Sequence, residues 1–393
     1  RIYSYIMANA VKSISIEGFK SISSLEKFYL GSLNILIGAN GAGKSNFIEF
    51  FRMLRAMAEE GLRAYIRMNG GADGFFFDGP KVTREISAVI EFGTGEYSFQ
   101  LTSAVNNAMV VIKEKVFSNE LDQWFTLTNG GEEADLKLWS DTAPGSKNIL
   151  KKAVTDDEEF ELLAIVAGKV LKAASSWIVY HFHDTSANNP LRRDQNLRDH
   201  KELRADAENI AAFLYNLRES SDELHKASYQ RIRRMIQIVA PFFDDFTLEP
   251  HNLGSKELIR LEWKQKGSSF PFQSMQFSDG TLRFICLATA LLQPDPPCTI
   301  VIDEPELGLH PVALDLLASL VKEAAMRTQV IVSTQSPTFL NSFEPEDIIV
   351  VDRVNSSSRF RRLIAGELRE WLDEYSLGDL VQKNVIEAGP RYA

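Results

Sequence analysis

An α/β fold is predicted for this chain by three features of its sequence. Short apolar runs suited to buried strands occur at residues 34–37, 298–302 and 330–333. Stretches with a helical spacing of apolar residues accompany them, at 46–58, 282–292 and 311–327. A glycine-rich turn joins the first of these strands to the first helix. Buried strands that alternate with helices indicate a sheet covered by helices, which is the α/β class.

The glycine-rich turn reads Gly38-Ala39-Asn40-Gly41-Ala42-Gly43-Lys44-Ser45. It matches the phosphate-binding pattern G-x-x-x-x-G-K-[ST], and it lies between a strand and a helix as that pattern requires. The backbone N–H groups of such a loop and the positive end of the following helix hold phosphates. Lys44 is expected to reach the β- and γ-phosphates, and the Ser45 hydroxyl to hold Mg²⁺. The sequence therefore predicts a P-loop protein that binds a nucleoside triphosphate.

The other elements follow along the chain. Residues 11–17 alternate as a strand does, and the helix after the glycine-rich turn is expected to end near Gly61. Residues 82–128 have period two and predict an antiparallel meander. The remaining expectations are a surface loop at 129–148, a mainly helical segment at 149–240 interrupted at 177–182 and 184–199, and strands at 257–264 and 348–351.

The composition excludes several classes of protein. The net charge of -10 argues against wholesale coating of nucleic acid, although it leaves room for a local basic stripe. The two cysteines, Cys286 and Cys298, predict neither a disulfide framework nor a zinc site, which suits a reducing compartment. No apolar run reaches the roughly 18 residues of a membrane span, so we expect a cytoplasmic protein that has no membrane partner.

A second motif is the apolar strand 298–302, which is followed directly by Asp303 and Glu304. In P-loop NTPases the first carboxylate after such a strand completes the Mg²⁺ shell. The second carboxylate is placed to act as a general base on an attacking water. A strand that merely ends in an acidic turn would look the same, but the phosphate loop upstream favours the catalytic interpretation.

Two further motifs offer polar groups at the ends of buried elements. Phe277-Ser278-Asp279-Gly280-Thr281 opens the apolar helix 282–292, where a hydroxyl, free N–H groups and the helix dipole provide a second anion site. A plain helix cap is the competing interpretation. The strand 330–333 leads into Thr334-Gln335-Ser336-Pro337, where a γ-phosphate sensor would lie.

In order and spacing, these motifs resemble those of ABC-type ATPases of the SMC/RecF/OLD kind, in particular the short members that lack a long coiled coil. Residues 38–45 resemble the Walker A motif, 277–281 the signature motif, 303–304 the Walker B motif, 306–311 the D-loop region, 334–337 the switch and 18–21 the N-terminus. The resemblance implies a P-loop ATPase head with a mixed central sheet, an antiparallel β subdomain and a helical insertion. It places the two halves of the head at 7–148 and 257–393, and the insertion at 149–256.

The resemblance also implies a mechanism. Two heads would enclose two ATP molecules with Mg²⁺. ATP would then close a homodimer or a higher oligomer, and hydrolysis would open it. In one chain the nucleotide would be bound by Asn40, Gly41, Gly43, Lys44 and Ser45, Mg²⁺ by Ser45 and Asp303, and the catalytic groups would be Glu304 and Gln335. Ser278 and Gly280 of the second chain would contact the γ-phosphate held by Lys44.

The sequence departs from the family pattern in two places. The switch position usually holds His, and here it is Gln335, which can hydrogen-bond phosphate or water but carries no charge. We therefore expect slow hydrolysis. About 40 residues follow Val351, too few for the Toprim nuclease domain of OLD proteins, so we expect any effector, a nuclease or a toxin, on a separate chain. Gln100 is a candidate for the family's Q-loop glutamine.

The predicted insertion carries two basic clusters in an acidic chain. They consist of Arg192, Arg193, Arg198, Lys201 and Arg204, and of Arg231, Arg233 and Arg234. These side chains could contact nucleic-acid phosphates, but neighbouring acidic residues favour a solvated, paired face. The segment His181-Phe182-His183-Asp184 offers no third metal ligand at a suitable spacing, so we interpret it as a polar strand end.

Three functions compete. The leading hypothesis is a dimeric ATPase whose closed and open states engage DNA or control a partner effector, in DNA repair or anti-phage defence. The second is an ATP-bound scaffold with slow turnover that holds a toxin or nuclease without binding DNA. A monomeric P-loop kinase is disfavoured by the helix-opening Ser278-Asp279-Gly280 and by the distant Asp303-Glu304 pair.

Overall fold

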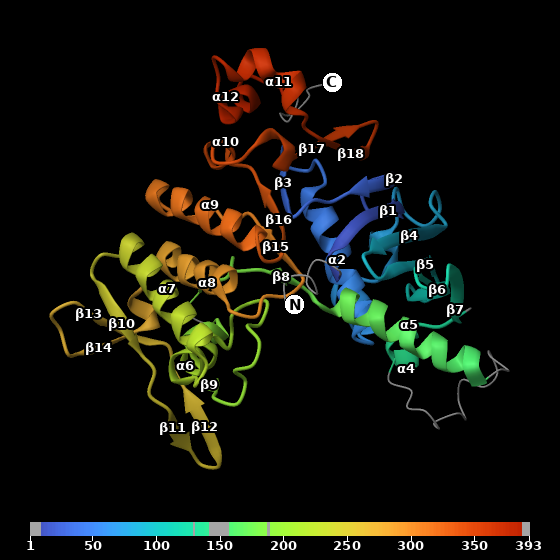
Figure 1. Ribbon diagram of the computed structural model, residues 1–393. Helices are drawn as coiled ribbons and strands as arrows, with labels where there is room; N and C mark the ends of the chain where they lie inside the picture. The colour runs from blue at the N-terminus through green and yellow to red at the C-terminus, as the bar shows by residue number, and fades with distance from the viewer. Residues whose placement is uncertain (1–8, 129, 141–156, 187–188, 387–393) are drawn as a thin grey trace.

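A computed structural model of the chain describes residues 9–128, 130–140, 157–186 and 189–386. Two six-stranded sheets dominate this part of the molecule (Figure 1). One sheet is antiparallel, and the other is mixed, with one antiparallel edge strand. Helices cover the mixed sheet, so the predicted α/β class with a mixed central sheet is confirmed.

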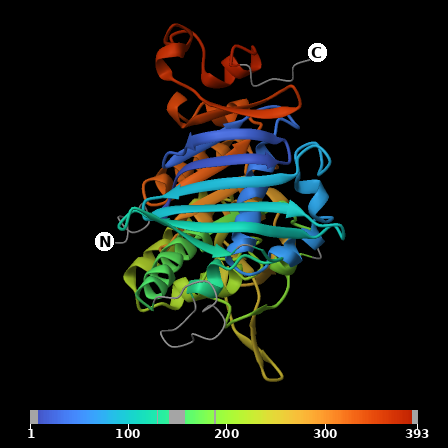
Figure 2. The same ribbon diagram turned by 90° about the vertical axis from the view of Figure 1, so that its right-hand side faces the viewer.

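The antiparallel sheet contains the predicted meander. Its strands, in spatial order, are β2 (Ile22–Tyr29), β1 (Val11–Phe19), β4 (Glu85–Phe92), β5 (Gly95–Ser103), β6 (Met109–Ser118) and β7 (Gln123–Thr128). Alternate residues of β4 and β5 are buried, as period two requires. The sheet lies in front of helix α2 (Lys44–Ala58) in Figure 2, and their aromatic side chains meet at Phe19 and Phe50, with ring centroids 5.2 Å apart.

The mixed sheet is the centre of the molecule. Its strands, in spatial order, are β18 (Ser357–Arg362), β17 (Ile348–Val354), β3 (Leu33–Ile37), β16 (Gln329–Thr334), β15 (Thr299–Asp303) and β8 (Trp177–Tyr180). All neighbours from β17 to β8 pair in parallel. Parallel strands end at the same edge, so the segments that follow β3, β16, β15 and β8 emerge side by side.

Both faces of the central sheet are buried, which explains why its strands read as continuous apolar runs. Leu36, Val301 and Ile331 belong to one core with α2, the antiparallel sheet and α5 (Asp157–Ser175). Ile35, Ile300 and Val330, on the opposite face, belong to a second core. That core includes residues of α6 (Ile210–Glu219), α7 (Glu223–Val239), α8 (Asp279–Leu292) and α9 (Pro311–Ala325).

Smaller elements complete the described chain. Two three-stranded sheets are formed by β10 (Phe243–Thr247), β13 (Glu262–Gln265) and β14 (Pro271–Gln273), and by β11 (His251–Leu253), β12 (Lys256–Ile259) and β9 (Gln195–Asn196). The short helices are α3 (Leu62–Met68), α4 (Leu136–Ser140), α10 (Pro337–Leu340), α11 (Ala365–Leu372) and α12 (Leu377–Gln382), with 3₁₀ turns η1 (Ala72–Phe75), η2 (Pro190–Arg192), η3 (Ser274–Gln276) and η4 (Pro345–Asp347). No helix of the described ranges is both long and apolar enough to cross a bilayer.

Two sequence expectations are corrected. Residues 129–148, expected as a surface loop, contain helix α4; its Trp139 is fully buried and donates to the Leu127 carbonyl at 3.0 Å, while 141–148 lie outside the described residues. The expected strand 257–264 is two strands, β12 and β13, because each pairs within a different small sheet. The predicted domain limits remain predictions.

We expect the stability of the protein to depend on pH because of Glu114, a fully buried residue of β6. Its carboxyl accepts hydrogen bonds from Tyr97 Oη and Asp135 N, both at 2.7 Å. Burial raises the pKa of Glu114 from its ordinary 4.5 to about 7. Between these values the folded state holds a proton that the unfolded state has lost, so stability falls as pH rises through this window. We expect the free energy of unfolding to fall by about 3 kcal/mol from pH 4 to pH 8.

Chemical denaturation across this pH range measures the effect. Glu114→Gln, which does not titrate, is expected to lose this slope, whereas the control Glu120→Gln, at an exposed carboxylate, is expected to keep it. An unchanged slope in Glu114→Gln would assign the pH dependence to other groups.

Candidate active site

The phosphate loop has the backbone shape that its glycines allow. Gly41 and Gly43 have φ of 78° and 116°, a region that L side chains rarely adopt. A Cβ at Gly43 would lie 2.0 Å from Ser358 Oγ, and one at Gly38 would lie 2.0 Å from the Val351 carbonyl oxygen. Gly38 and Gly43 therefore let the loop lie directly against the β17–β18 hairpin.

A buried polar cluster supports the underside of this loop. Ser358 Oγ lies 2.6 Å from the Ala42 carbonyl oxygen and 2.7 Å from Ser21 Oγ, and Asn46 Nδ2 donates to Ser21 Oγ at 2.7 Å. Ser358 N also donates to the Ser21 carbonyl at 2.7 Å. The cluster joins the antiparallel sheet, the phosphate loop and the β17–β18 hairpin. The sequence marks only Ser21, as part of the family-like segment 18–21.

Lys44, at the start of α2, is buried, with 4 % of its surface exposed. Its Nζ donates to the carbonyls of Gly38 at 2.7 Å and Ala39 at 3.1 Å, so the amine turns back over the loop. Burial lowers the pKa of Lys44, and the charges of Glu304, Asp303 and Glu306 act in the opposite direction. The ammonium group therefore lies in the field of the carboxylates after β15, although these are about 260 residues away in sequence.

The Walker B pair meets the switch segment at the next strand end. Asp303 accepts a hydrogen bond from Ser333 Oγ, and Glu304 N donates to the Ser333 carbonyl at 3.0 Å. Glu304 has φ of 43°, a left-handed conformation that is uncommon for a residue with a Cβ. Gln335 Nε2 donates to Glu304 Oε1. The structure thus brings together both residues that were predicted to be catalytic.

Glu306 has a role that the sequence did not reveal. Its Oε1 accepts from Thr334 Oγ1 at 2.6 Å and from Gln335 N at 2.8 Å, which fixes the backbone of the switch. Its Oε2 is buried and, among the described residues, has no hydrogen-bond partner. Ser333 was missed in the same way, since a serine at the end of a buried strand gives no sequence signal of the carboxylate it contacts.

The signature residues lie at the first turn of α8. Ser278 caps the helix, its Oγ accepting from Thr281 N at 3.2 Å. A Cβ at Gly280 would lie 2.3 Å from the Gly308 carbonyl oxygen, so this glycine allows the helix to touch the D-loop. Across the described ranges, no hydrogen bond or ion pair joins Ser278 or Gly280 to the phosphate loop of the same chain.

Two arginines fasten the chain after β8 to this helix. Arg283 donates to the carbonyls of Phe182 at 3.0 Å, His183 at 3.2 Å and Leu307. Arg192, whose side chain is 5 % exposed, donates to the carbonyls of Thr185 and Ser274 and pairs with Asp279 at 3.0 Å. Arg192 is therefore a buried structural group, not a member of the solvent-facing basic cluster in which the sequence placed it.

Three of the seven other basic residues in the two clusters have acidic partners. Arg231 pairs with Glu323, Arg233 with Asp244 and Arg204 with Asp199. The paired interpretation therefore holds for these three residues, whereas Arg193, Arg198, Lys201 and Arg234 have no ion pair within the described part of the chain.

Two further candidates are placed by the structure. Gln100 lies within β5 on the antiparallel sheet, so it does not support a Q-loop assignment. His181 follows β8 beside the Walker B strand, and its ring lies 4.6 Å from that of His183. Within the described part of the chain, no cluster of three or more His, Cys, Asp or Glu residues suits a metal ion.

Comparisons with known proteins identify the family of the chain and its fold. A family model described as "AAA domain, putative AbiEii toxin, Type IV TA system" matches residues 33–129 and 164–341, which together are more than half of the chain. The chain belongs to this AAA family. No curated protein matches its sequence.

Solved SMC heads are similar to this AAA protein in fold. A structure of an Smc head bound to the C-winged helix domain of ScpA aligns with a TM-score of 0.56 and 15 % identity, covering 91 % of this chain and 99 % of that one. An Smc head with an extended coiled coil, bound to the C-terminal domain of ScpA derived from Pyrococcus furiosus, gives a TM-score of 0.51 at 15 % identity, covering 93 % and 99 %. The predicted ABC-type ATPase head is therefore confirmed at the level of the fold.

A matched pair of glycines tests the contact between α8 and the D-loop. Gly280 and Gly366 both occupy the second position of a helix, but a Cβ at Gly366 meets nothing within 4 Å. We expect Gly280→Ala to lower the free energy of unfolding by about 1–3 kcal/mol, because the Gly308 backbone must move. Gly366→Ala is expected to be neutral or to stabilise by up to about 1 kcal/mol. Equal effects in denaturant titrations would contradict a close contact specific to Gly280.

Proposed function

We propose that this AAA protein is an ATPase that dimerises around ATP and uses the closed state to control a partner effector. One observation carries the proposal. The phosphate loop, the Walker B carboxylates and the switch glutamine converge at one sheet edge, whereas Ser278 and Gly280 contact other parts of their own chain. A site that still needs the signature residues is completed by a second copy of the chain.

The residues present suit ATP and Mg²⁺. The loop glycines leave backbone N–H groups uncovered by side chains, and no Cβ would be obstructed at Gly41. We assign nucleotide binding to Asn40, Gly41, Gly43, Lys44 and Ser45, and Mg²⁺ binding to Ser45 and Asp303. Bound there, Mg²⁺ would neutralise charge on the phosphates.

The chain's own groups account for the remaining steps. Ser333 holds Asp303 through a hydrogen bond, and Glu306 holds the backbone of Gln335. Glu304 is positioned to take a proton from water, and the Gln335 amide orients the Glu304 carboxylate. Lys44, released from the carbonyls of Gly38 and Ala39, would turn to the phosphates. Ser278 and Gly280 of the second chain would present a hydroxyl and the start of α8 to the γ-phosphate.

The overall charge favours control of a protein partner over engagement of DNA. The net charge is -10, and half of the eight clustered basic residues, namely Arg192, Arg204, Arg231 and Arg233, are already held by carboxylates or backbone carbonyls. The uncharged residue at the switch, Gln335, is expected to make ATP hydrolysis slow. Both features support a scaffold function, in which an ATP-closed dimer holds a toxin or nuclease. Whether the dimer then serves anti-phage defence or DNA repair would depend on that partner.

The size of Glu304→Gln in solution tests the dimer. Without the general base, ATP persists, and we expect the variant to elute as a dimer with ATP and Mg²⁺ and as a monomer without them. Lys44→Ala in the same background is expected to stay monomeric, as is Ser278→Arg, which places a bulky side chain on the signature surface. Duplex DNA is expected to leave these sizes unchanged. A Glu304→Gln protein that never responds to ATP would refute the dimer.

Gln335→Leu tests the switch. The substitution keeps the volume but removes the amide that holds Glu304. We expect kcat for ATP to fall at least about tenfold, a loss of about 1.4 kcal/mol in transition-state stabilisation, with little change in KM. Gln335→His, which restores a hydrogen-bonding ring, is expected to retain turnover. A lower affinity for ATP with unchanged kcat would show that Gln335 binds nucleotide and takes no part in hydrolysis.

A further inference from the structure

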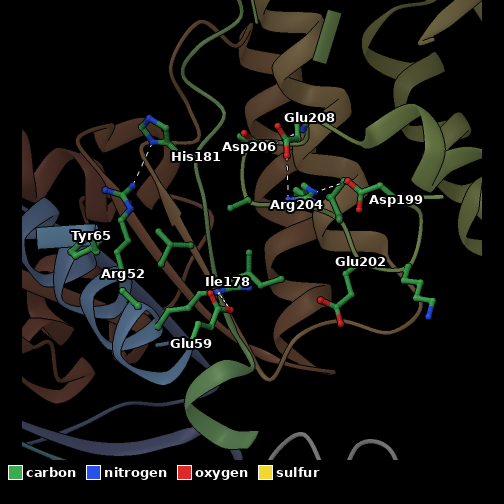
Figure 3. Close-up of a pocket in the computed structure, with 16 residues that line it drawn as sticks. Arg52, Glu59, Tyr65, Ile178, His181, Asp199, Glu202, Arg204, Asp206 and Glu208 are labelled. Atoms are coloured by element: carbon green, nitrogen blue, oxygen red, sulfur yellow. Dashed lines mark hydrogen bonds and ion pairs between the residues drawn. The ribbon is translucent and has the colours of Figure 1, made fainter. Parts of the chain in front are cut away.

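A cleft of about 840 Å³ opens beside the nucleotide site (Figure 3). One wall is the second half of α2 with Tyr65 of α3, the floor is β8, and the other wall is the segment 199–208. Arg52 of α2 points toward His181 at the end of β8, where its guanidinium lies 3.5 Å from Nδ1. The cleft therefore lies between α2 and the segment 199–208. His181, which lines it, directly follows Tyr180, and Tyr180 pairs with Ile302, the residue before Asp303.

The floor of the cleft is a free strand edge. Among the strands of the described residues, β8 is the last of the central sheet and pairs only with β15. In a strand, the N–H and C=O of alternate residues point to the same side. The Trp177 carbonyl accepts from Arg55 Nη1 at 2.9 Å and His181 N donates to the Ala205 carbonyl at 2.8 Å, both on the side away from β15. The backbone groups of Val179, midway between them, must face the same side.

The outward backbone N–H and C=O of Val179 are the groups of this edge that lack a hydrogen-bond partner among the described residues. The residue lines the cleft and is 6 % exposed, yet no hydrogen bond from the described residues reaches its outward N–H or C=O. Buried backbone groups without partners are costly, and native proteins rarely leave them so. A donor and an acceptor side by side on a strand edge are the groups that an added strand would pair with.

The charges around this edge indicate the side chains of such a strand. Arg55 is paired with Glu59, and Arg204 with both Asp199 and Glu208. Two exposed carboxylates of the cleft, Glu202 and Asp206, have no ion-pair partner in the described chain, against one such cation, Lys201. The cleft thus has spare negative charge beside the free backbone groups.

We propose that this cleft binds an extended peptide segment of a partner protein, which pairs with the Val179 backbone and places separate basic side chains against Glu202 and Asp206. The segment adds one short strand to the central sheet beyond β8. Its binding requires neither ATP nor a second head, so it stands independently of the proposed dimer. Because His181 links the cleft to the end of β8, an occupant would lie next to the Walker B edge.

A heptapeptide of alternating valine and lysine, labelled for fluorescence anisotropy, tests the proposal on the full chain without nucleotide. We expect it to bind with a Kd below about 1 mM, and the glutamate analogue to bind at least about tenfold more weakly. N-methylation of its central valine, which removes the donor to the Val179 carbonyl, is expected to cost a similar factor. Hydrogen exchange of the Val179 amide should be fast in the free protein and slow when the peptide is bound.

Matched variants locate the binding. The double variant Glu202→Lys/Asp206→Lys is expected to weaken binding of the lysine peptide at least about tenfold, a loss of about 1.4 kcal/mol. Glu249→Lys/Glu257→Lys makes the same change in charge at exposed carboxylates outside the cleft and should leave binding unchanged. Ala205→Trp keeps the backbone bond to His181 but fills the cleft, and should abolish binding.

Three results would each overturn the proposal. These are no binding of the lysine peptide at about 1 mM, binding that persists in Ala205→Trp, and a Val179 amide already protected in the free protein. The last result would mean that ordered water or the segment 199–208 satisfies the edge. None of the three bears on ATP-dependent dimerisation, so the two proposals fail separately.

Discussion

The parallel pairing of β3, β16, β15 and β8 is the constraint on which the site depends. The registers align Thr334 with Ile37, Ser333 with Asp303, and Ile302 with Tyr180. The phosphate loop, the switch, the Walker B pair and His181 therefore leave the sheet at one edge. Parallel strands need crossovers that cover both faces of the sheet, and so the same pairing also produces the two buried cores.

Polar side chains hold the lobes around this sheet in place. Gln329 is buried, and its amide donates to the carbonyls of Val11 and Gly31 while accepting from Val11 N and Thr299 Oγ1. Both ends of this amide are satisfied, so it ties β1 to β15 and to the start of β3 without an unpaired group. The Ser21–Ser358 cluster does the same under the phosphate loop. Such contacts fix the site to a rigid frame, which a preorganised catalytic centre needs.

The proposed function follows from which site residues contact each other within one chain and which do not. Glu304 and Gln335 contact each other within one chain, whereas the signature segment contacts Arg192 and Gly308 and, in the described ranges, forms no hydrogen bond or ion pair with its own phosphate loop. Arg283 connects the chain after β8 to the D-loop beside the signature helix. A partner segment in the cleft beside β8 would therefore lie close to groups that contact both the Walker B edge and the signature surface.

The sequence by itself determined the P-loop class, the order of the motifs and the pair of carboxylates that ends a buried strand, because these depend on local chemistry. A loop that binds phosphate needs glycines at fixed spacing, and a buried strand that ends in two acidic residues can be recognised from eight consecutive residues. It also predicted the meander, since period two is a local pattern.

Only the tertiary structure decided which side chains serve those motifs. Ser21 and Ser358 are separated by 337 positions, and Arg192 and Asp279 by 87. A serine or arginine looks the same in sequence whether it is solvated or buried against a distant carbonyl, so no local pattern distinguishes Arg192 from its paired neighbour Arg204. The free edge of β8 is decided in the same way, because an edge exists only once the order of strands in the sheet is set.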